Sequence, residues 1–196
     1  MIVNTDIKFF YFIDTLDEIV KKNIKNFKKL SFIYKSNSIS NLNINIIKNF
    51  CKKNKISLFI YDNFKLANKY QADGVLLSSS YKKIGNIFLK KNNFKIIGSA
   101  HNQFEYYLKS RQFCEIIMLS PLFYNKKYSP NKILNICKFN LITMKWKSKI
   151  CALGGINLNN LKKLNMTRSS AAAFVSLMKE NNQKKSPLTI SSKRAF

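Results

Sequence analysis

The chain has 196 residues, of which 46% are hydrophobic and 13% aromatic, and its formal net charge is +26. This length supports one domain with a sizeable core, and the apolar content excludes a disordered chain. No stretch approaches the roughly 20 apolar residues of a membrane span, and the apolar run Phe9–Ile13 is too short for a signal peptide, so we expect a cytoplasmic protein without membrane contact.

Short apolar runs alternate with amphipathic segments along the chain. The apolar runs predict eight β-strands: Phe9–Ile13, Leu30–Tyr34, Ser57–Ile60, Gly74–Leu77, Lys95–Ser99, Glu115–Leu119, Lys149–Leu153 and Ala171–Val175. The helical spacing of apolar side chains predicts seven helices between them: Leu16–Phe27, Leu42–Phe50, Phe64–Tyr70, Ile84–Phe88, Gln103–Arg111, Lys132–Cys137 and Leu158–Leu164.

The strict alternation of strands and helices favours a parallel sheet that is buried on both sides. Eight strands are the number that closes a TIM barrel. We therefore predict a single-domain α/β fold, a compact (β/α)8 TIM barrel over residues 1–180, with an open doubly wound sheet as the alternative. Residues 181–196 are polar and basic and are expected to form a frayed tail.

Polar residues or glycines follow all eight predicted strands. In parallel barrels the loops after the strands form the functional face. The residues at these positions are Asp14, Lys35, Asp62, Ser78, Ser79, Ser80, His101, Ser120, Asn125, Lys126, Lys127, Gly154, Gly155 and Ser176.

The Gly154–Gly155 pair directly follows the predicted seventh strand. Glycine lets a backbone approach an anion closely and present its N–H groups, and the helix expected next would bring its positive N-terminus nearby. Ser176 ends the neighbouring strand and could add a hydroxyl or an N–H. Phosphate sites built from the loops after strands seven and eight recur in TIM barrels, so we favour a phosphate site over the alternative of a simple tight turn.

His101 is the only histidine, and either a structural or a catalytic role fits it. Asp62 ends a predicted strand, where it could hold Mg²⁺ or cap the next helix, and the sequence leaves both roles open. The four cysteines are scattered without a C-x-x-C pair, which predicts reduced, mostly buried thiols rather than a zinc site. They are Cys51, Cys114, Cys137 and Cys151.

The positive charge is spread along a chain in which Lys, Asn and Ile dominate. We therefore favour compositional drift over nucleic-acid binding as its cause, and we expect nucleic acid to bind only weakly. The carboxylates are less evenly spread, because none lies between Ile116 and Lys179. Such a region suits an anionic ligand, so the expected partners are phosphorylated small molecules. The oligomeric state is left open.

Five segments in order carry a family resemblance: Ala72–Val75 (A-D-G-V), Ser99–Glu105 (S-A-H-N, then E), Ser120–Phe123 (S-P-L-F), Ala152–Asn157 (A-L-G-G-I-N) and Val175–Ser176. Their order and spacing resemble the thiamine-phosphate synthase family from about Phe9 to Ser176. The resemblance implies a TIM barrel that joins hydroxymethylpyrimidine pyrophosphate to a thiazole phosphate and releases pyrophosphate. It also implies that Mg²⁺ and basic residues hold the leaving pyrophosphate.

Positions after the predicted strands, together with the resemblance, assign roles to individual residues. Those assigned to substrate or phosphate binding are Lys35, Ser78, Asn125, Lys126, Gly154, Gly155 and Ser176. The candidate catalytic residues are His101 and Lys127, and the candidate Mg²⁺ ligand is Asp62.

The chain departs from the family pattern in its pyrophosphate half. The run that carries a second Mg²⁺ carboxylate in the family reads Leu76–Tyr81 here and contains three serines instead. Ile33, Lys35 and Asn37 replace a Gln, an Arg and a Lys. We therefore expect weak Mg²⁺ binding without pyrophosphate, and an alternative remains: a family member that binds or alters a thiazole phosphate or thiamine phosphate without synthase activity.

Overall fold

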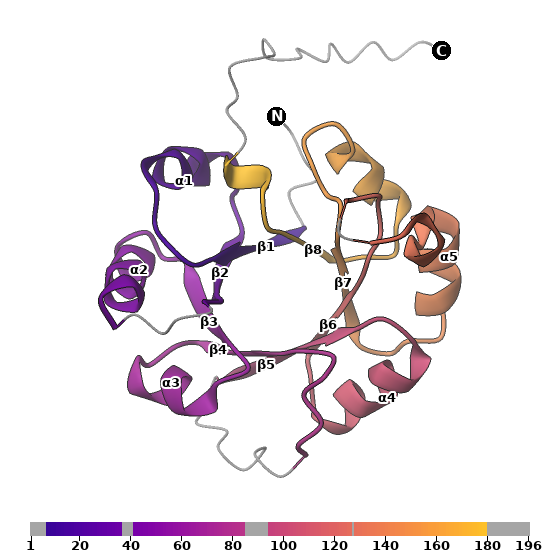
Figure 1. Ribbon diagram of the computed structural model, residues 1–196, viewed down its shortest axis with the longest axis horizontal. Helices are drawn as coiled ribbons and strands as arrows, with labels where there is room; N and C mark the ends of the chain where they lie inside the picture. Colours follow the sequence, from indigo (N-terminus) through magenta and orange to yellow (C-terminus); the bar gives the residue numbers. More distant parts are fainter. Residues whose placement is uncertain (1–6, 37–40, 85–93, 127, 180–196) are drawn as a thin grey trace, which may run out of the picture.

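The computed structural model describes residues 7–36, 41–84, 94–126 and 128–179. Eight parallel strands form a closed barrel in chain order, with β8 paired to β1 (Figure 1). The strands are β1 Lys8–Ile13, β2 Leu30–Tyr34, β3 Ser57–Tyr61, β4 Gly74–Leu77, β5 Lys95–Ala100, β6 Ile116–Leu119, β7 Lys149–Leu153 and β8 Ala171–Phe174. The predicted TIM barrel is confirmed, and no strand end differs from its predicted position by more than one residue.

Helices lie around the outside of the barrel (Figure 1). They are α1 Glu18–Asn23, α2 Asn41–Lys53, α3 Phe64–Lys69, α4 Gln103–Arg111 and α5 Asn135–Thr143. The 3₁₀ turns are Ile24–Asn26, Pro130–Lys132, Leu161–Met166 and Leu177–Lys179. Within the described part of the chain, no helix has the length and apolarity needed to cross a membrane.

The helix predicted at Lys132–Cys137 is displaced in the structure. A 3₁₀ turn ends at Lys132, and α5 begins only at Asn135. Asn135 has a positive φ of 52°, and its side-chain oxygen accepts a hydrogen bond from the N–H of Lys138 at 3.1 Å. This local side-chain bond satisfies a free N–H of the first turn and so fixes where the helix starts.

The helix predicted at Leu158–Leu164 is replaced by the 3₁₀ turn Leu161–Met166. Asn157 Oδ1 accepts from the N–H groups of Asn159 and Asn160, while Asn160 Oδ1 accepts from the N–H of Asn157. Asparagine side chains that bond nearby backbone in this way compete with α-helical hydrogen bonds. Of the helix predicted at Ile84–Phe88, Ile84 is not helical and the rest lies outside the described residues.

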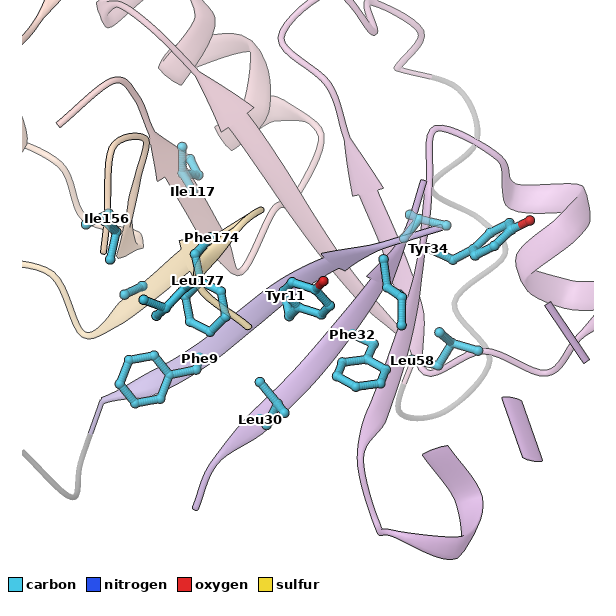
Figure 2. Close-up of a cluster of buried hydrophobic side chains, with 14 of the residues drawn as sticks. Phe9, Tyr11, Leu30, Phe32, Tyr34, Leu58, Ile117, Ile156, Phe174 and Leu177 are labelled. Carbon is cyan, nitrogen blue, oxygen red and sulfur yellow. The ribbon is translucent and has the colours of Figure 1, made fainter. Parts of the chain in front are cut away.

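The core has two layers, because successive side chains of each strand point inward and outward in turn. The barrel interior is filled by Phe10, Ile33, Phe59, Leu76, Ile97, Met118, Cys151, Ala171 and Ala173. The larger outer layer packs between the barrel and its helices, and Figure 2 shows Phe9, Tyr11, Leu30, Phe32 and Tyr34 directed to this side of β1 and β2. Burial on both faces explains why the strands read as continuous apolar runs.

Candidate functional site

The barrel brings the loops after its strands to one face, because all eight strands run parallel around a closed sheet. Asp62, Ser78 and His101 directly follow β3, β4 and β5. Gly155 lies two residues after β7, and Ser176 lies two residues after β8. The predicted placement of Asp62, His101, Gly155 and Ser176 at the carboxyl face is therefore confirmed.

The remaining candidates lie at the same face where the structure describes them. Lys35 directly follows β2, is exposed, and holds its Nζ 4.3 Å from the ring centroid of Tyr61, which ends β3. This cation–π contact orients the ammonium at the barrel mouth. Asn125 and the exposed Lys126 belong to the loop between β6 and α5. Lys127 lies outside the described residues.

The glycine pair lets two loops pack directly against each other. Gly154 and Gly155 have φ angles of +96° and +69°, a region that glycine adopts without steric cost. A Cβ added to Gly155 would lie 2.4 Å from the carbonyl oxygen of Phe123 and 2.6 Å from that of Tyr124. The close approach that requires glycine is thus to the loop after β6, a neighbour that the sequence did not reveal.

Hydrogen bonds fasten this glycine turn on both sides. The carbonyl of Gly154 accepts from the N–H of Phe123 at 3.0 Å, and the carbonyl of Gly155 accepts from Nδ2 of Asn160 at 2.7 Å. Among the described residues, the N–H groups of Gly155 and Ser176 donate to no other part of the protein, and Ser176 is exposed. Backbone donors are therefore available for an anion after β7 and β8.

Asp62 joins the loops after β3 and β4. Its Oδ1 accepts a hydrogen bond of 2.7 Å from the N–H of Ser78, and its φ is +51°. The alternative of a helix cap is wrong, because Asn63 caps α3 by accepting from the N–H of Leu66 at 2.8 Å. The hydroxyls of Ser78 and Ser80 lie 3.0 Å apart, so a carboxylate and two hydroxyls belong to one corner of the face.

The chemistry of this corner fits Mg²⁺ only in part. Carboxylate and hydroxyl oxygens are hard ligands, and Mg²⁺ commonly takes one or two protein carboxylates together with phosphate oxygens and water. The described residues contain no group of three His, Cys, Asp or Glu side chains that could hold a metal ion. Asp62 would therefore need oxygens of the ligand to complete a magnesium site.

His101 is fixed by the loop after β6. Its ring Nδ1 lies 2.9 Å from the carbonyl oxygen of Ser120 and 3.1 Å from the hydroxyl of the same residue, and its backbone N–H donates to Oε2 of Glu105 at 2.6 Å. A carbonyl oxygen can only accept, so this contact favours the tautomer with the proton on Nδ1. Nε2 is then the nitrogen that can accept a proton or a hydrogen bond.

The cysteines take no part in the site. Cys51, Cys114 and Cys151 are buried and Cys137 is exposed, and all four are free thiols, as predicted. Burial raises the pKa of Cys51 and of Cys114 to about 12. A thiol with so high a pKa carries almost no thiolate near neutral pH and is a poor nucleophile.

Two residues that matter at this face were not identified from the sequence. Asn160 holds the carbonyl of Gly155, and a signal for it exists in the paired asparagines at 157 and 160, since asparagine readily bonds nearby backbone. The other is Lys109, which is fully buried on α4. No sequence signal indicates it, because lysine is almost always exposed.

Comparison with known proteins gives consistent results. Residues 35–179 match the family model described as thiamine monophosphate synthase. The thiamine-phosphate synthase of Flavobacterium johnsoniae is 33% identical over 146 residues, which cover 71% of this chain and 69% of that protein. The putative thiamine-phosphate synthase 2 of Aquifex aeolicus is 24% identical over 151 residues, or 77% of this chain and 81% of that one.

Among solved structures, the thiamine phosphate pyrophosphorylase from Pyrococcus furiosus superposes with a TM-score of 0.71. Its sequence identity is 17%, and the match covers 88% of this chain and 87% of that chain. At this identity the likeness shows a shared fold. The family rests instead on the sequence matches.

Proposed function

This chain belongs to the thiamine monophosphate synthase family, and we propose on that premise that it is a cytoplasmic transferase that joins hydroxymethylpyrimidine pyrophosphate to a thiazole phosphate. The new bond forms between the thiazole nitrogen and the pyrimidine methylene, and the bond from the methylene to pyrophosphate breaks. The observation that carries the proposal is the gathering of Asp62, His101, Gly155 and Ser176 at one barrel face.

The thiazole phosphate is assigned to the loops after β7 and β8. The N–H groups of Gly155 and Ser176 make no hydrogen bond within the described protein, and the Ser176 hydroxyl is exposed. No carboxylate lies between Ile116 and Lys179 to repel the anion. Binding the phosphate here would hold the thiazole in a fixed orientation for attack, which is a major part of the rate enhancement of a two-substrate reaction.

The pyrophosphate is assigned to the opposite part of the face, near Asp62. Asp62, with the hydroxyls of Ser78 and Ser80, would hold Mg²⁺ once pyrophosphate oxygens complete the coordination. Bound there, Mg²⁺ would neutralise charge on the leaving pyrophosphate. Lys35, whose Nζ lies over the ring of Tyr61 next to Asp62, supplies positive charge on this side of the face. Nε2 of His101 can accept a hydrogen bond from a substrate.

The direct test is an assay of the purified protein with both substrates and Mg²⁺. We expect thiamine phosphate and pyrophosphate to form in equal amounts, and product to be absent when either substrate is omitted. Failure to form product under these conditions, with a folded protein, would contradict the synthase proposal.

One observation favours a second function, binding of a thiazole phosphate or thiamine phosphate without synthesis. The loop after β4 carries serine hydroxyls at positions 78–80, where the family pattern has a second Mg²⁺ carboxylate. Under this alternative the protein would bind the monophosphates but form no product. The same assay, combined with calorimetric titration of thiamine phosphate, separates the two functions.

Replacing Ser176 with alanine should weaken thiazole-phosphate binding by about fivefold, because one hydrogen bond contributes on the order of 1 kcal/mol. The backbone donors of the site would remain, so binding should not be lost. The measurement is calorimetric titration with thiazole phosphate. Ser170→Ala, at the opposite end of the same strand, is the matched control and should bind like wild type. If Ser176→Ala binds thiazole phosphate as tightly as wild type does, this hydroxyl does not contact the phosphate.

A further inference from the structure

A buried polar pair at the C-terminal end of α4 holds the loop after β4. The side chains of Lys109 and Gln112 are 0% and 1% exposed. Nζ of Lys109 donates to the carbonyl of Tyr81 at 2.9 Å and to Oε1 of Gln112 at 3.0 Å. Nε2 of Gln112 donates to the carbonyls of Tyr81 and Lys83 at 2.9 and 3.0 Å. Two side chains thus make three hydrogen bonds to the backbone of one loop.

The barrel wall leaves space for this lysine. A Cβ added to Gly98, in the middle of β5, would lie 2.9 Å from both Cγ and Cδ of Lys109 and 2.9 Å from Sγ of Cys114. The aliphatic part of Lys109 therefore occupies volume that any other residue at position 98 would fill. Burying a lysine is costly unless its donors are satisfied, and here its amine reaches two acceptors.

The clamped loop leads directly to the Asp62 corner. The N–H of Tyr81 donates to the carbonyl of Ser78 at 3.1 Å, and the N–H of Ser78 donates to Oδ1 of Asp62 at 2.7 Å. The hydroxyl of Ser80, on the same loop, contacts that of Ser78. A continuous series of hydrogen bonds therefore runs from α4 through the loop to the carboxylate.

We infer that Lys109 and Gln112 are positioning residues that fix the loop Ser78–Lys83 and thereby the Asp62 corner of the site. They act through the backbone of this loop and do not touch the substrate. The inference rests on the proposed function only in naming pyrophosphate as the ligand of that corner. It also explains how a loop that carries serines in place of a carboxylate keeps a defined shape.

The clamp can form whether or not the lysine carries its charge. Burial lowers the pKa of Lys109, while the nearby Cys114, Asp62 and Glu105 oppose this shift. A neutral amine still has two N–H donors, which suffice for Tyr81 and Gln112. The hydrogen bonds of Lys109 to the loop are therefore kept in either protonation state.

The test compares Gln112→Met, Lys109→Met and the double variant with wild type. Methionine matches the length of glutamine, is one atom shorter than lysine and has no donor, and replacing the pair together leaves neither side chain with an unpaired buried polar group. The matched control is Arg111→Met, an exposed change on the same helix that also removes one positive charge. Hydrogen exchange of the amides of Ser78–Lys83 and calorimetric binding of Mg²⁺-pyrophosphate are measured in each protein, with thiazole phosphate as the second ligand.

We expect the double variant to exchange the Ser78–Lys83 amides at least about fivefold faster and to bind Mg²⁺-pyrophosphate about fivefold more weakly, the change that losing one net hydrogen bond of about 1 kcal/mol produces. Thiazole-phosphate affinity should not change, which distinguishes positioning of one corner from a general loss of structure. If these amides exchange in the double variant at the same rate as in Arg111→Met, Lys109 and Gln112 do not hold the loop. If the wild-type protein binds no Mg²⁺-pyrophosphate, the proposed function is contradicted. The hydrogen-exchange rates would still show whether Lys109 and Gln112 hold the loop.

Discussion

Replacing Gly155 with valine is expected to abolish thiazole-phosphate binding and to destabilise the protein by about 2 kcal/mol or more. A branched side chain is strained at a φ of +69°, and its Cβ would overlap the carbonyls of Phe123 and Tyr124 at 2.4 and 2.6 Å. Both contacts are with backbone, so the loops after β6 and β7 must separate. This displaces the donors assigned to the phosphate.

Thermal unfolding and calorimetric titration measure the two effects. A loss of about 2 kcal/mol lowers the melting temperature by about 4–8 °C in a chain of this size. Asn159→Val is the matched control, because it adds the same side chain at an exposed position of the same loop, and it should bind and melt much as wild type does. A Gly155→Val protein with unchanged stability and affinity would contradict both the packing of the two loops and the site.

Replacing Asp62 with asparagine should lower the Mg²⁺-dependent synthase rate by at least about a hundredfold while the protein still folds. The amide oxygen can still accept from the N–H of Ser78, and asparagine tolerates the φ of +51°. What is lost is the carboxylate charge. A metal ion at a phosphoryl group contributes several kcal/mol, and each 1.36 kcal/mol corresponds to tenfold in rate.

Steady-state kinetics at several Mg²⁺ concentrations test this expectation, together with Mg²⁺ titrations in the presence and absence of pyrophosphate. Glu18→Gln is the control, because it removes a negative charge from an exposed position of α1 that is not part of the Asp62 corner. Wild type should bind Mg²⁺ measurably only with pyrophosphate. Tight binding to the free protein, or a fully active Asp62→Asn variant, would show that another carboxylate, such as Asp14, holds the metal.

The positions of the strands and the composition of the carboxyl face were predictable because they depend on local pattern. Strands that are buried on both sides must be apolar throughout, so β2, β4 and β7 were predicted to the residue. Parallel closure then requires the residues that follow the strands to meet at one end. Asp62 and His101 could therefore be placed together although 38 other residues separate them in the chain.

The helices were less predictable because their ends depend on individual side-chain bonds. The apolar spacing after β7 indicated a helix, but the paired bonds of Asn157 and Asn160 replaced its first turn and left a 3₁₀ turn. Likewise, the bond from Lys138 N–H to Asn135 set the start of α5. Each such bond changes the stability of a helix end by about 1 kcal/mol. The spacing of apolar residues carries no information about these bonds.

The sequence by itself determined the barrel, the end of the barrel at which the candidate residues meet and the family to which the chain belongs, since each of these follows from residue order. Only the tertiary structure decided which neighbours each residue contacts. Position 155 must be glycine because a side chain there would overlap the backbone of Phe123. The absence of a side chain at Gly98 leaves room for the buried Lys109. Contacts between segments far apart in the chain depend on how side chains fill the available volume and on which hydrogen-bond donors and acceptors lie close enough to pair. No local stretch of sequence specifies either of these.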